Sequence, residues 1–445
     1  MLFNKTIKNN FINIKAIIGK KNSINDDGKN ITFVFSKKQN QSTVIFFRQF
    51  SSIILKHPKK NVNINISSFI DIFPVKDVLS LVVMILVKLD SFVEPSFNLK
   101  SNYVKTQANI IYNKKHTNII KKANIICQSF HLARQYQIMP TNYLGIKDFV
   151  DGITNDLKLL KNKNLKIKVL WDKDLNKQKC GLIQAVNKGS DESAALVVIE
   201  YFNNLQSPKV ALVGKGIMVD TGGYELKPSR FMQGMNQDMT GAAVVFGIIH
   251  ALAAINAKVN VVGVLPLAKN LINSKSMLVN DIYKACNGRS VEILSQDSEG
   301  RLILADALAY VNKKYKISKA ITIATLTGLS AISFGDYLTP FWATKINTSK
   351  LISEAGDLSG DGLISLPFFP DFFEAIDKSS VLADCANSCS TRDASNSLAA
   401  AFLKTFCACD DFVHFDIAGT NEFKKHPVNP LGLTIINLLF KLNNN

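Results

Sequence analysis

The sequence has little that would point to a membrane or secreted protein. A bilayer-spanning helix needs about 20 consecutive apolar residues. The best candidate, Val78–Val87, has ten residues and is followed at once by Lys88 and Asp90. The first 21 residues lack the apolar core and small-residue cleavage site of a signal peptide, and they contain lysine but no arginine, unlike a typical transit peptide. We therefore expect a cytoplasmic protein with no membrane segment.

Cysteine and histidine are also scarce. The chain has seven cysteines and six histidines in 445 residues. The pairs Cys385/Cys389 and Cys407/Cys409 lack the spacing and the histidines of a zinc finger. We therefore expect reduced thiols, as in a cytoplasm-like compartment.

The glycine-rich stretch 214–223, GKGIMVDTGG, fits neither of the common nucleotide-binding patterns. Lys215 lies between two glycines and does not follow G-x-x-x-x-G, and Val219 occupies the third glycine position of G-x-G-x-x-G. The motif therefore argues against phosphate-loop and dinucleotide binding.

Positive charge is abundant but unevenly spread. The net charge is +18; residues 1–140 hold 21 Lys+Arg against 6 Asp+Glu, a net +15, and the remainder holds 32 against 29, a net +3. A basic excess of that size attracts nucleic acid or acidic surfaces. A lysine- and asparagine-rich coding bias that produces a solvated surface explains the same numbers, so both interpretations stay open.

The pattern of apolar runs predicts an α/β protein with two domains. Residues 1–117 form a small basic N-terminal α/β domain, residues 118–140 a linking helix that ends at Pro140, and residues 141–445 the larger domain. Strand–helix alternation in the larger domain indicates a mixed, mostly parallel sheet covered by helices on both faces. The predicted strands are 31–36, 42–47 and 61–66 in the first domain, and 166–171, 194–202, 209–214, 260–268, 291–295, 320–328 and 412–419 in the second. The predicted helices are 78–89, 241–255 and 302–311.

Acidic side chains gather at the ends of these predicted strands. In SQDSEGRL, residues 295–302, Asp297, Glu299 and Arg301 alternate, and in an extended segment that spacing sends all three side chains to one side. Asp220 and Asp238 follow another strand. Converging carboxylates repel unless cations neutralise them, and four acids match two divalent ions sharing a water better than one. Solvated loop carboxylates are the alternative.

Two motifs resemble the cytosolic leucine aminopeptidase family. SQDSEGRL corresponds to the family signature N-T-D-A-E-G-R-L, and VGKGIMVDTGGYELKP, residues 213–228, corresponds to its second block. The likeness extends over roughly residues 131–442 and includes TLTG at 325–328 and HFDIAGT at 414–420. The resemblance implies a metal-dependent enzyme that removes N-terminal residues from peptides, apolar ones preferentially, and that assembles as a homohexamer.

The resemblance also implies roles for individual residues. One metal would be bound by Asp220, Asp297 and Glu299, and a second by Lys215, Asp220, Asp238 and Glu299. Lys215 must then be a neutral amine, which burial beside dications favours. This donor set suits Mn or Zn, with Co or Mg as alternatives. Lys227 and Arg301 would be catalytic, with Arg301 holding a bicarbonate ion. The residues implied to contact the substrate are Met235, Thr325, Leu326 and Gly328.

Some residues depart from the family pattern. Ser295, Gln296 and Ser298 replace Asn, Thr and Ala, and the stretch 387–397 lacks the usual glycine pair and arginine. His414 lies between strand residues and is interpreted as structural. Two rival hypotheses remain: a DNA-binding regulatory protein that uses the basic N-terminal region, with or without peptidase activity, and a catalytically silent relative that keeps its metals for structure. Intact Lys227 and Arg301 argue against the second.

Overall fold

The chain divides into two compact units, which are described separately. The computed structural model describes residues 2–3, 12–19, 23–27, 29–36, 43–56, 62–72, 78–90, 108–204, 206–389, 393–423 and 426–444. Unit 1 comprises Met1–His131 with Glu354–Gly362, and unit 2 comprises Leu132–Ser353 with Leu363–Asn445. The division at His131 falls inside helix α4 (Thr117–Gln137), the segment predicted to link the domains. That Glu354–Gly362 belongs with the N-terminal unit was not predicted from the sequence.

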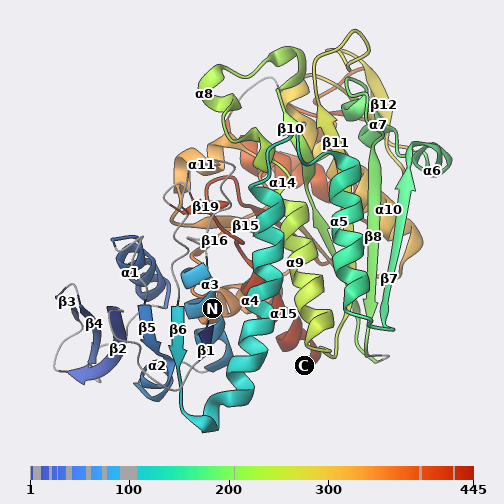
Figure 1. Ribbon diagram of the computed structural model, residues 1–445. Helices are drawn as coiled ribbons and strands as arrows, with labels where there is room; N and C mark the ends of the chain where they lie inside the picture. The colour runs from blue at the N-terminus through green and yellow to red at the C-terminus, as the bar shows by residue number, and fades with distance from the viewer. Residues whose placement is uncertain are drawn as a thin grey trace. The chain divides into compact units, whose positions relative to one another are not determined.

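Unit 1 is a small α/β unit built on one sheet (Figure 1). The strand order is β1-β6-β5-β2-β4-β3, and every neighbouring pair is parallel except β3 and β4. The strands are β1 (Leu2–Phe3), β2 (Ile12–Gly19), β3 (Ser23–Asp26), β4 (Asn30–Ser36), β5 (Val62–Asn65) and β6 (Ala108–Ile111). The other elements are α1 (Thr43–Lys56), α2 (Ile66–Ile72), α3 (Val78–Asp90) and the 3₁₀ turn η1 (Lys114–His116).

One predicted strand of unit 1 is a helix. The sequence predicts a strand at residues 42–47, STVIFF, because β-branched and aromatic residues favour strands, but residues 43–47 begin α1, and Ser42 lies outside the described residues. The spacing of Phe46 and Phe50 puts both rings on one helix face, where they pack against Phe33 with ring centroids 5.5 and 5.6 Å away. Burial of this helical face therefore overrides the local preference.

Unit 2 is built on a nine-stranded mixed sheet. The order is β16-β15-β18-β14-β9-β11-β8-β7, with β10 paired to β11. The central pairs β18–β14, β14–β9 and β9–β11 are parallel, and β8 and β7 continue the sheet antiparallel. The strands are β7 (Leu165–Trp171), β8 (Ala195–Phe202), β9 (Lys209–Gly214), β10 (Gly216–Asp220), β11 (Asn260–Asn270), β14 (Lys319–Ala324), β15 (Thr339–Ala343), β16 (Leu363–Leu366) and β18 (Phe412–Asp416).

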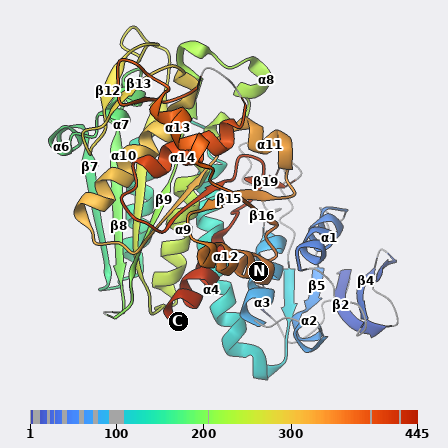
Figure 2. The same cartoon turned by 180° about the vertical axis from the view of Figure 1, so that it is seen from behind.

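Helices cover both faces of this sheet, as predicted. Figure 1 shows α5 and α9 in front of the strands, and Figure 2 shows α10, α13 and α14 on the opposite side. All eleven residues of β11 are buried, as expected for a strand covered on both faces. The helices are α5 (Ile146–Leu159), α6 (Asp172–Gln178), α7 (Gly181–Asn187), α8 (Ser229–Met232), α9 (Thr240–Ala254), α10 (Glu299–Lys314), α11 (Gly328–Phe334), α12 (Ile346–Ser359, which crosses into unit 1), α13 (Pro370–Asp377), α14 (Ser395–Thr405) and α15 (Gly432–Asn444). The α/β class is therefore confirmed.

Short elements complete unit 2 around the ends of the central strands. A three-stranded sheet joins β12 (Ile282–Lys284), β13 (Ser290–Glu292) and β17 (Cys385–Ala386), and a two-stranded one joins β19 (Glu422–Phe423) and β20 (His426–Pro427). Three 3₁₀ turns are η2 (Gly223–Glu225) after β10, η3 (Met235–Gln237) between α8 and α9, and η4 (Gln296–Ser298) between β13 and α10. All seven cysteines are free thiols.

Among the described residues, the longest apolar helical stretch is Ser229–Ala254, which joins α8, η3 and α9, rather than the predicted Val78–Val87. By length and composition alone it could cross a membrane, but 89% of its most apolar window is buried inside the structure. Burial of that degree is what a core helix shows, so its apolar character is explained by packing against the sheet.

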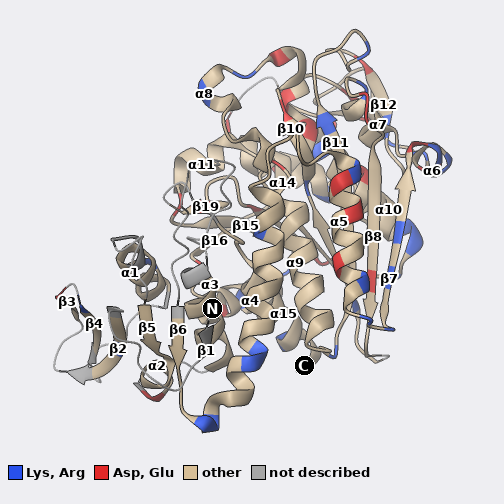
Figure 3. Ribbon diagram, viewed as in Figure 1, with Lys and Arg blue, Asp and Glu red and all other residues tan. Residues whose placement is uncertain are grey.

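The free edge of the large sheet at β7 carries lysines. Lys166 and Lys168 are exposed on alternate positions, while Ile167 and Val169 are half-buried. These lysines and those of the neighbouring α6 appear as blue segments in Figure 3. Strand β7 thus has a half-buried face and a charged face.

Candidate metal centre

The candidate ligands lie where the chain leaves the strands of the central sheet. Lys215 directly follows β9, Asp220 is the last residue of β10, and Asp238 comes two residues before α9. Glu299 is the first residue of α10. Because the parallel strands β9, β11 and β14 end at the same edge of the sheet, residues far apart in sequence meet there.

The segment Asp297–Arg301 is not extended, which corrects the sequence interpretation. Asp297 lies in the 3₁₀ turn η4, and Glu299 and Arg301 lie in the first turn of α10. The i, i+2 spacing therefore does not place the two acids on one side of a strand. The turn between Asp297 and Glu299 nevertheless brings them together, since ligand oxygens of Asp220, Asp297 and Glu299 lie within 4.8 Å of one another.

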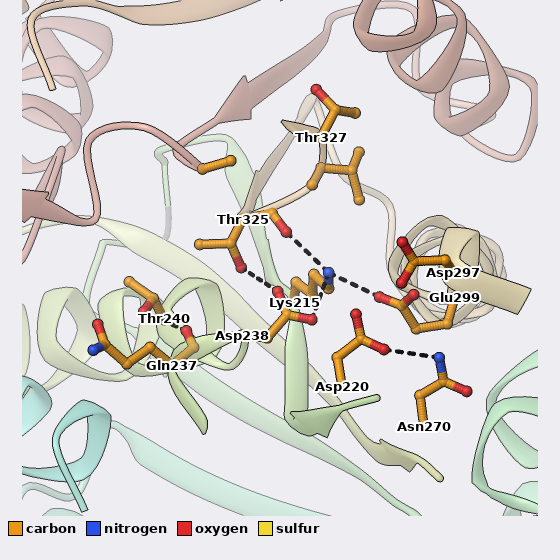
Figure 4. A network of polar contacts seen from close by, with 12 residues as sticks. Lys215, Asp220, Gln237, Asp238, Thr240, Asn270, Asp297, Glu299, Thr325 and Thr327 are labelled. Atoms are coloured by element: carbon orange, nitrogen blue, oxygen red, sulfur yellow. Dashed lines mark hydrogen bonds and ion pairs between the residues drawn. The ribbon is translucent and has the colours of Figure 1, made fainter. Parts of the chain in front are cut away.

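Lys215 lies at the buried centre of the cluster. Its Nζ donates to the main-chain oxygen of Thr325 at 2.9 Å and forms ion pairs with Asp238 Oδ2 at 2.8 Å and Glu299 Oε1 at 2.9 Å. Figure 4 shows the amine of Lys215 between the carboxylates of Asp238 and Glu299. The side chains of Lys215, Asp238 and Glu299 are 3%, 5% and 2% exposed, so the charges are almost completely removed from water.

Lys227 joins the two other acids on the more open side of the cluster. Its Nζ lies 2.8 Å from Asp220 Oδ2 and also forms an ion pair with Asp297 Oδ1. The side chains of Lys227 and Asp297 are 14% and 39% exposed. The five predicted metal ligands and Lys227 are therefore brought together, with Lys215 on the deep side and Lys227 on the solvent side.

Two further residues hold these acids and were not predicted to do so. Asn270, the last residue of β11, donates from Nδ2 to Asp220 Oδ1 at 2.8 Å and to Gln296 O at 3.0 Å. The Thr325 hydroxyl donates to Asp238 Oδ1 at 2.6 Å. Asn270 could have been suspected from the sequence, because a polar residue ends the apolar run of β11 at the edge where the acids lie.

Gly300 permits the close approach of Lys215 to α10. A Cβ atom at Gly300 would lie 2.4 Å from Lys215 Cε and 2.7 Å from Nζ, well inside any allowed contact. Glycine is therefore required at position 300 for a steric reason, because any side chain there would displace the Lys215 amine at the centre of the cluster.

Burial and mutual repulsion shift the acids toward their neutral forms. Burial raises the pKa of Glu299 to about 8, with the charge of Asp220 adding to the effect. Burial also raises the pKa of Asp238 to about 6, although Lys215 opposes the shift. Burial alone would lower the pKa of Lys215, but the charges of Asp238, Glu299 and Asp220 outweigh it and raise that pKa. Burial by itself therefore does not supply a neutral amine.

The donor set fits divalent metal ions. Glu299 Oε2 is buried and has no hydrogen-bond partner among the described residues, although Oε1 is paired with Lys215. Burying such an oxygen is costly unless a cation or donor satisfies it. Carboxylate oxygens with one amine nitrogen form a hard site, suited to ions such as Mn²⁺ or Zn²⁺.

The described hydrogen bond of Arg301 is made with the main chain and not with an acid of the cluster. Its Nη1 donates to the main-chain oxygen of Asn387 at 2.8 Å, and its Nε has no partner among the described residues. Burial lowers the pKa of Arg301 to about 10. The side chain is thus a buried cation in the first turn of α10, two residues after Glu299, with part of its guanidinium uncommitted.

The residues implied to contact substrate border the same site. Thr325, Leu326 and Gly328 follow β14, and the Leu326 main-chain N–H donates to Asp416 Oδ1 at 3.0 Å. Gly328 begins α11, and a Cβ placed there would meet no atom within 4 Å. Met235 begins η3, three residues before Asp238. Of these four, Thr325 is the one whose described contacts reach the acidic cluster.

Comparison with known proteins identifies the family to which the chain belongs. The profile of the cytosol aminopeptidase family, catalytic domain, matches residues 131–437. A probable cytosol aminopeptidase of Mycoplasma pneumoniae is 36% identical over 370 residues, which cover 82% of each chain. The chain belongs to the cytosol aminopeptidase family. It is an aminopeptidase, a peptide hydrolase of a metal-dependent family, as the resemblance predicted.

The chain is also similar to other cytosol aminopeptidases in sequence and to solved structures in fold. A probable cytosol aminopeptidase of Brucella melitensis is 34% identical over 316 residues, 69% of this chain and 64% of that protein. Leucyl aminopeptidase from Trypanosoma cruzi superposes with a TM-score of 0.82 at 22% identity, covering 97% of this chain and 93% of that one. The bottromycin maturation enzyme BotP, solved in complex with Mn, has a TM-score of 0.82 at 21% identity, covering 97% and 99%. The structural matches establish the fold.

Proposed function

We propose that this aminopeptidase releases N-terminal residues, preferably apolar ones, using two divalent metal ions in each subunit. The observation that carries the proposal is the convergence of four acids on two lysines at one edge of the sheet, with a buried oxygen of Glu299 left without a partner. A bound cation would satisfy this oxygen, whose burial without a partner is otherwise costly.

The proposed ligands form two sets, one for an ion near the solvent side of the cluster and one for an ion on its buried side. Asp220, Asp297 and Glu299, whose oxygens lie within 4.8 Å of one another, would hold the outer ion. Lys215, Asp238, Asp220 and Glu299 would hold the inner one, with Lys215 as a neutral amine. Mn or Zn fits the donors best, with Co or Mg as alternatives. Bound ions would supply Lewis-acid polarisation of the peptide carbonyl and an activated water.

The chain's own residues orient the substrate and stabilise charge. The exposed fraction rises from 3% at Lys215 to 14% at Lys227 and 39% at Asp297, which supports approach of the peptide from the side of Lys227. The Asp220, Asp297 and Glu299 carboxylates keep the pKa of Lys227 raised although burial opposes them, so this side chain stays an ammonium. It would donate to the oxygen that becomes negative as the peptide bond is attacked. Arg301 would hold a small anion such as bicarbonate.

The preference for apolar residues rests on the segment after β14. Leu326 and Gly328, with Met235 from η3, would line the pocket for the N-terminal side chain, and Thr325 would border it. The open space beside Gly328 supports this assignment. The free α-amino group, which only a chain end presents, would be a ligand of one of the two ions, and this would restrict the enzyme to N-terminal residues.

The cellular setting is proposed from the family. We expect a cytoplasmic homohexamer that acts on peptides with a free N-terminus. DNA binding is a second candidate role, favoured by the net charge of +15 over residues 1–140. Binding through such charges should weaken steeply with added salt. Absence of any DNA retardation at low salt would remove this candidate.

Peptide hydrolysis tests the main proposal. Purified protein is assayed on leucine, methionine and cysteinyl-glycine substrates, with and without Mn or Zn. Asp297→Ala should abolish turnover, whereas Asp174→Ala, which removes an exposed acid paired with Lys177 on α6, should leave it unchanged. Full turnover by Asp297→Ala, or metal-independent turnover by the natural chain, would overturn the proposed site.

A further inference from the structure

Asn387 connects two strands of the small sheet to the metal-ligand turn. It follows β17, which pairs in parallel with β13 so that Val291 lies opposite Cys385. The Asn387 main-chain N–H donates to Glu292 O at 2.9 Å. The residue is fully buried. The backbone of Asn387 is therefore positioned by strand pairing, independently of the contacts that its side chain makes.

The Asn387 amide saturates the backbone just ahead of Asp297. Its Oδ1 accepts from the main-chain N–H groups of Leu294 and Ser295 at 2.8 and 3.2 Å, and its Nδ2 donates to Ser295 O at 2.5 Å. Three backbone groups of two consecutive residues are thus held by one side chain. Asparagine is suited to this because one end of its amide accepts and the other donates.

The opposite side of the same turn is held by Glu225. Its Oε2 accepts from the Ser295 hydroxyl at 2.5 Å and from the Asp297 main-chain N–H at 3.2 Å. Ser295, which stands where the family has asparagine, therefore has a hydrogen-bonding role in this chain. The turn carrying Asp297 is held from both sides, with the buried contacts supplied by Asn387.

The main chain of Asn387 acts on a second functional residue. Its carbonyl oxygen accepts from Arg301 Nη1 at 2.8 Å, while Arg301 Nε has no partner among the described residues. The direction of the guanidinium therefore depends on where this carbonyl lies. One residue controls the turn before Asp297 through its side chain and Arg301 through its backbone.

We propose that Asn387 is a positioning residue of the metal centre. Its amide sets the turn that directs Asp297 and Glu299 toward the bound ions, and its carbonyl orients Arg301. The inference rests on the proposed function, because it assigns Asn387 to the same site. Groups that orient metal ligands typically contribute 10–100-fold to metal affinity or activity.

The test compares Asn387→Ala with Asn260→Ala. Asn260, the first residue of β11, is also buried, and its amide likewise binds loop backbone, accepting from Asn204 N at 3.1 Å and donating to Ser207 O at 2.7 Å. Mn²⁺ affinity is measured by titration calorimetry on the full chain, with kcat, KM and the unfolding temperature in chelator measured alongside. Asn387→Ala should weaken Mn²⁺ binding about 10-fold or more and lower kcat, and Asn260→Ala should change only the unfolding temperature.

A conservative pair covers the case in which the alanine variant does not fold. Asn387→Asp keeps the shape and both acceptor contacts but loses the donor to Ser295 O, so a smaller loss of Mn²⁺ affinity is expected than in Asn387→Ala. Asn260→Asp is its control. Natural Mn²⁺ affinity in Asn387→Ala would overturn the inference, as would natural affinity and kcat in Asn387→Asp where the alanine variant does not fold, or equal losses in the Asn260 variants. A natural chain that binds Mn²⁺ but cleaves no peptide would instead count against the proposed function, with the affinity comparison still valid.

Discussion

The hydroxyl of Thr325 lies 2.6 Å from Asp238 Oδ1, and the main-chain oxygen of Thr325 accepts from Lys215. We expect Thr325→Val to lower metal affinity and kcat about 10-fold, because the buried Asp238 loses a donor that fixes its orientation. Thr325→Ser should restore both. Metal content after dialysis and steady-state kinetics provide the measurement.

A matched threonine separates this effect from general destabilisation. Thr348 donates to Asp411 Oδ2 at 2.8 Å beside buried Lys319, which reproduces the Thr–Asp–Lys arrangement away from the metal centre. Thr348→Val should lower stability without lowering metal affinity. If Thr325→Val changes only KM, its role is substrate contact.

Gly300→Ala should inactivate the enzyme without unfolding it. Alanine is the better helix former by about 1 kcal/mol, so the first turn of α10 should tolerate it. The added methyl group, however, would overlap Lys215 and displace its amine. Circular dichroism should show a natural helix content while turnover and inner-metal binding are lost. Natural activity in this variant would contradict the position assigned to Lys215.

Metal removal should abolish activity but leave the fold intact. Lys215 and Lys227 each pair with two of the four acids, so positive charge remains in the cluster when a chelator is present. Far-UV circular dichroism should be unchanged in EDTA, and added Mn²⁺ should restore turnover. Cooperative unfolding on chelation would contradict this expectation.

Lys215→Met should lower the free energy of unfolding in EDTA by about 3–5 kcal/mol, the usual cost of removing one partner of a buried ion pair. With Mn²⁺ present the loss should shrink, since the ion then neutralises Asp238 and Glu299. Lys319→Met, which breaks the buried pair with Asp411, should cost the same with and without metal. Urea unfolding under both conditions distinguishes the two lysines.

His414 should make the fold sensitive to acid. Its Nδ1 lies 2.8 Å from the Thr322 hydroxyl, and burial, with a smaller effect of Arg301, lowers its pKa to about 3. The unfolded chain has a histidine pKa near 6.5 and takes up the proton first, so the stabilisation from neutral His414 is complete above about pH 6.5 and is lost as pH falls toward 3, by up to about 1.4 kcal/mol per pH unit. His414→Gln should lack this slope in acid-unfolding curves. An unchanged slope would show that other groups cause the acid sensitivity.

Gly328→Val should weaken the binding of substrates with a large N-terminal side chain relative to those with a small one. A Cβ at this position meets no atom within 4 Å, so the fold should accept the change. If the space beside Gly328 receives the N-terminal side chain, KM for a leucyl substrate should rise while KM for an alanyl substrate changes little. A parallel rise for both substrates would place the pocket elsewhere.

Much of the site could be predicted because its residues are carried by short segments at strand ends. Lys215, Asp220 and Asp238 come after the apolar run of β9, which the sequence identifies, whereas β10 (Gly216–Asp220) was not predicted as a strand. The conformation of Gln296–Ser298 could not be predicted, because the turn is held by Asn387 and Glu225, which are distant in sequence. The same holds for the start of α1 at residues 43–47, because the ring of Phe46 packs against Phe33 on β4.

The charge state of Lys215 was also beyond sequence reasoning. Whether burial or neighbouring carboxylates dominate depends on distances of about 3 Å that only the folded chain fixes. Asp238 and Glu299 lie at 2.8 and 2.9 Å, which decides in favour of the ammonium form when no metal competes.

Strand β7 lies at the edge of the large sheet and carries two exposed lysines, Lys166 and Lys168, at alternate positions. A second molecule that tried to extend the sheet at this edge would have to bring Lys166 and Lys168 against their own copies and strip water from all four ammonium groups. Edge-to-edge pairing of β7 between two molecules is therefore disfavoured. Concentrated preparations should resist amyloid-like association at low ionic strength, and replacing both lysines with threonine should remove that protection.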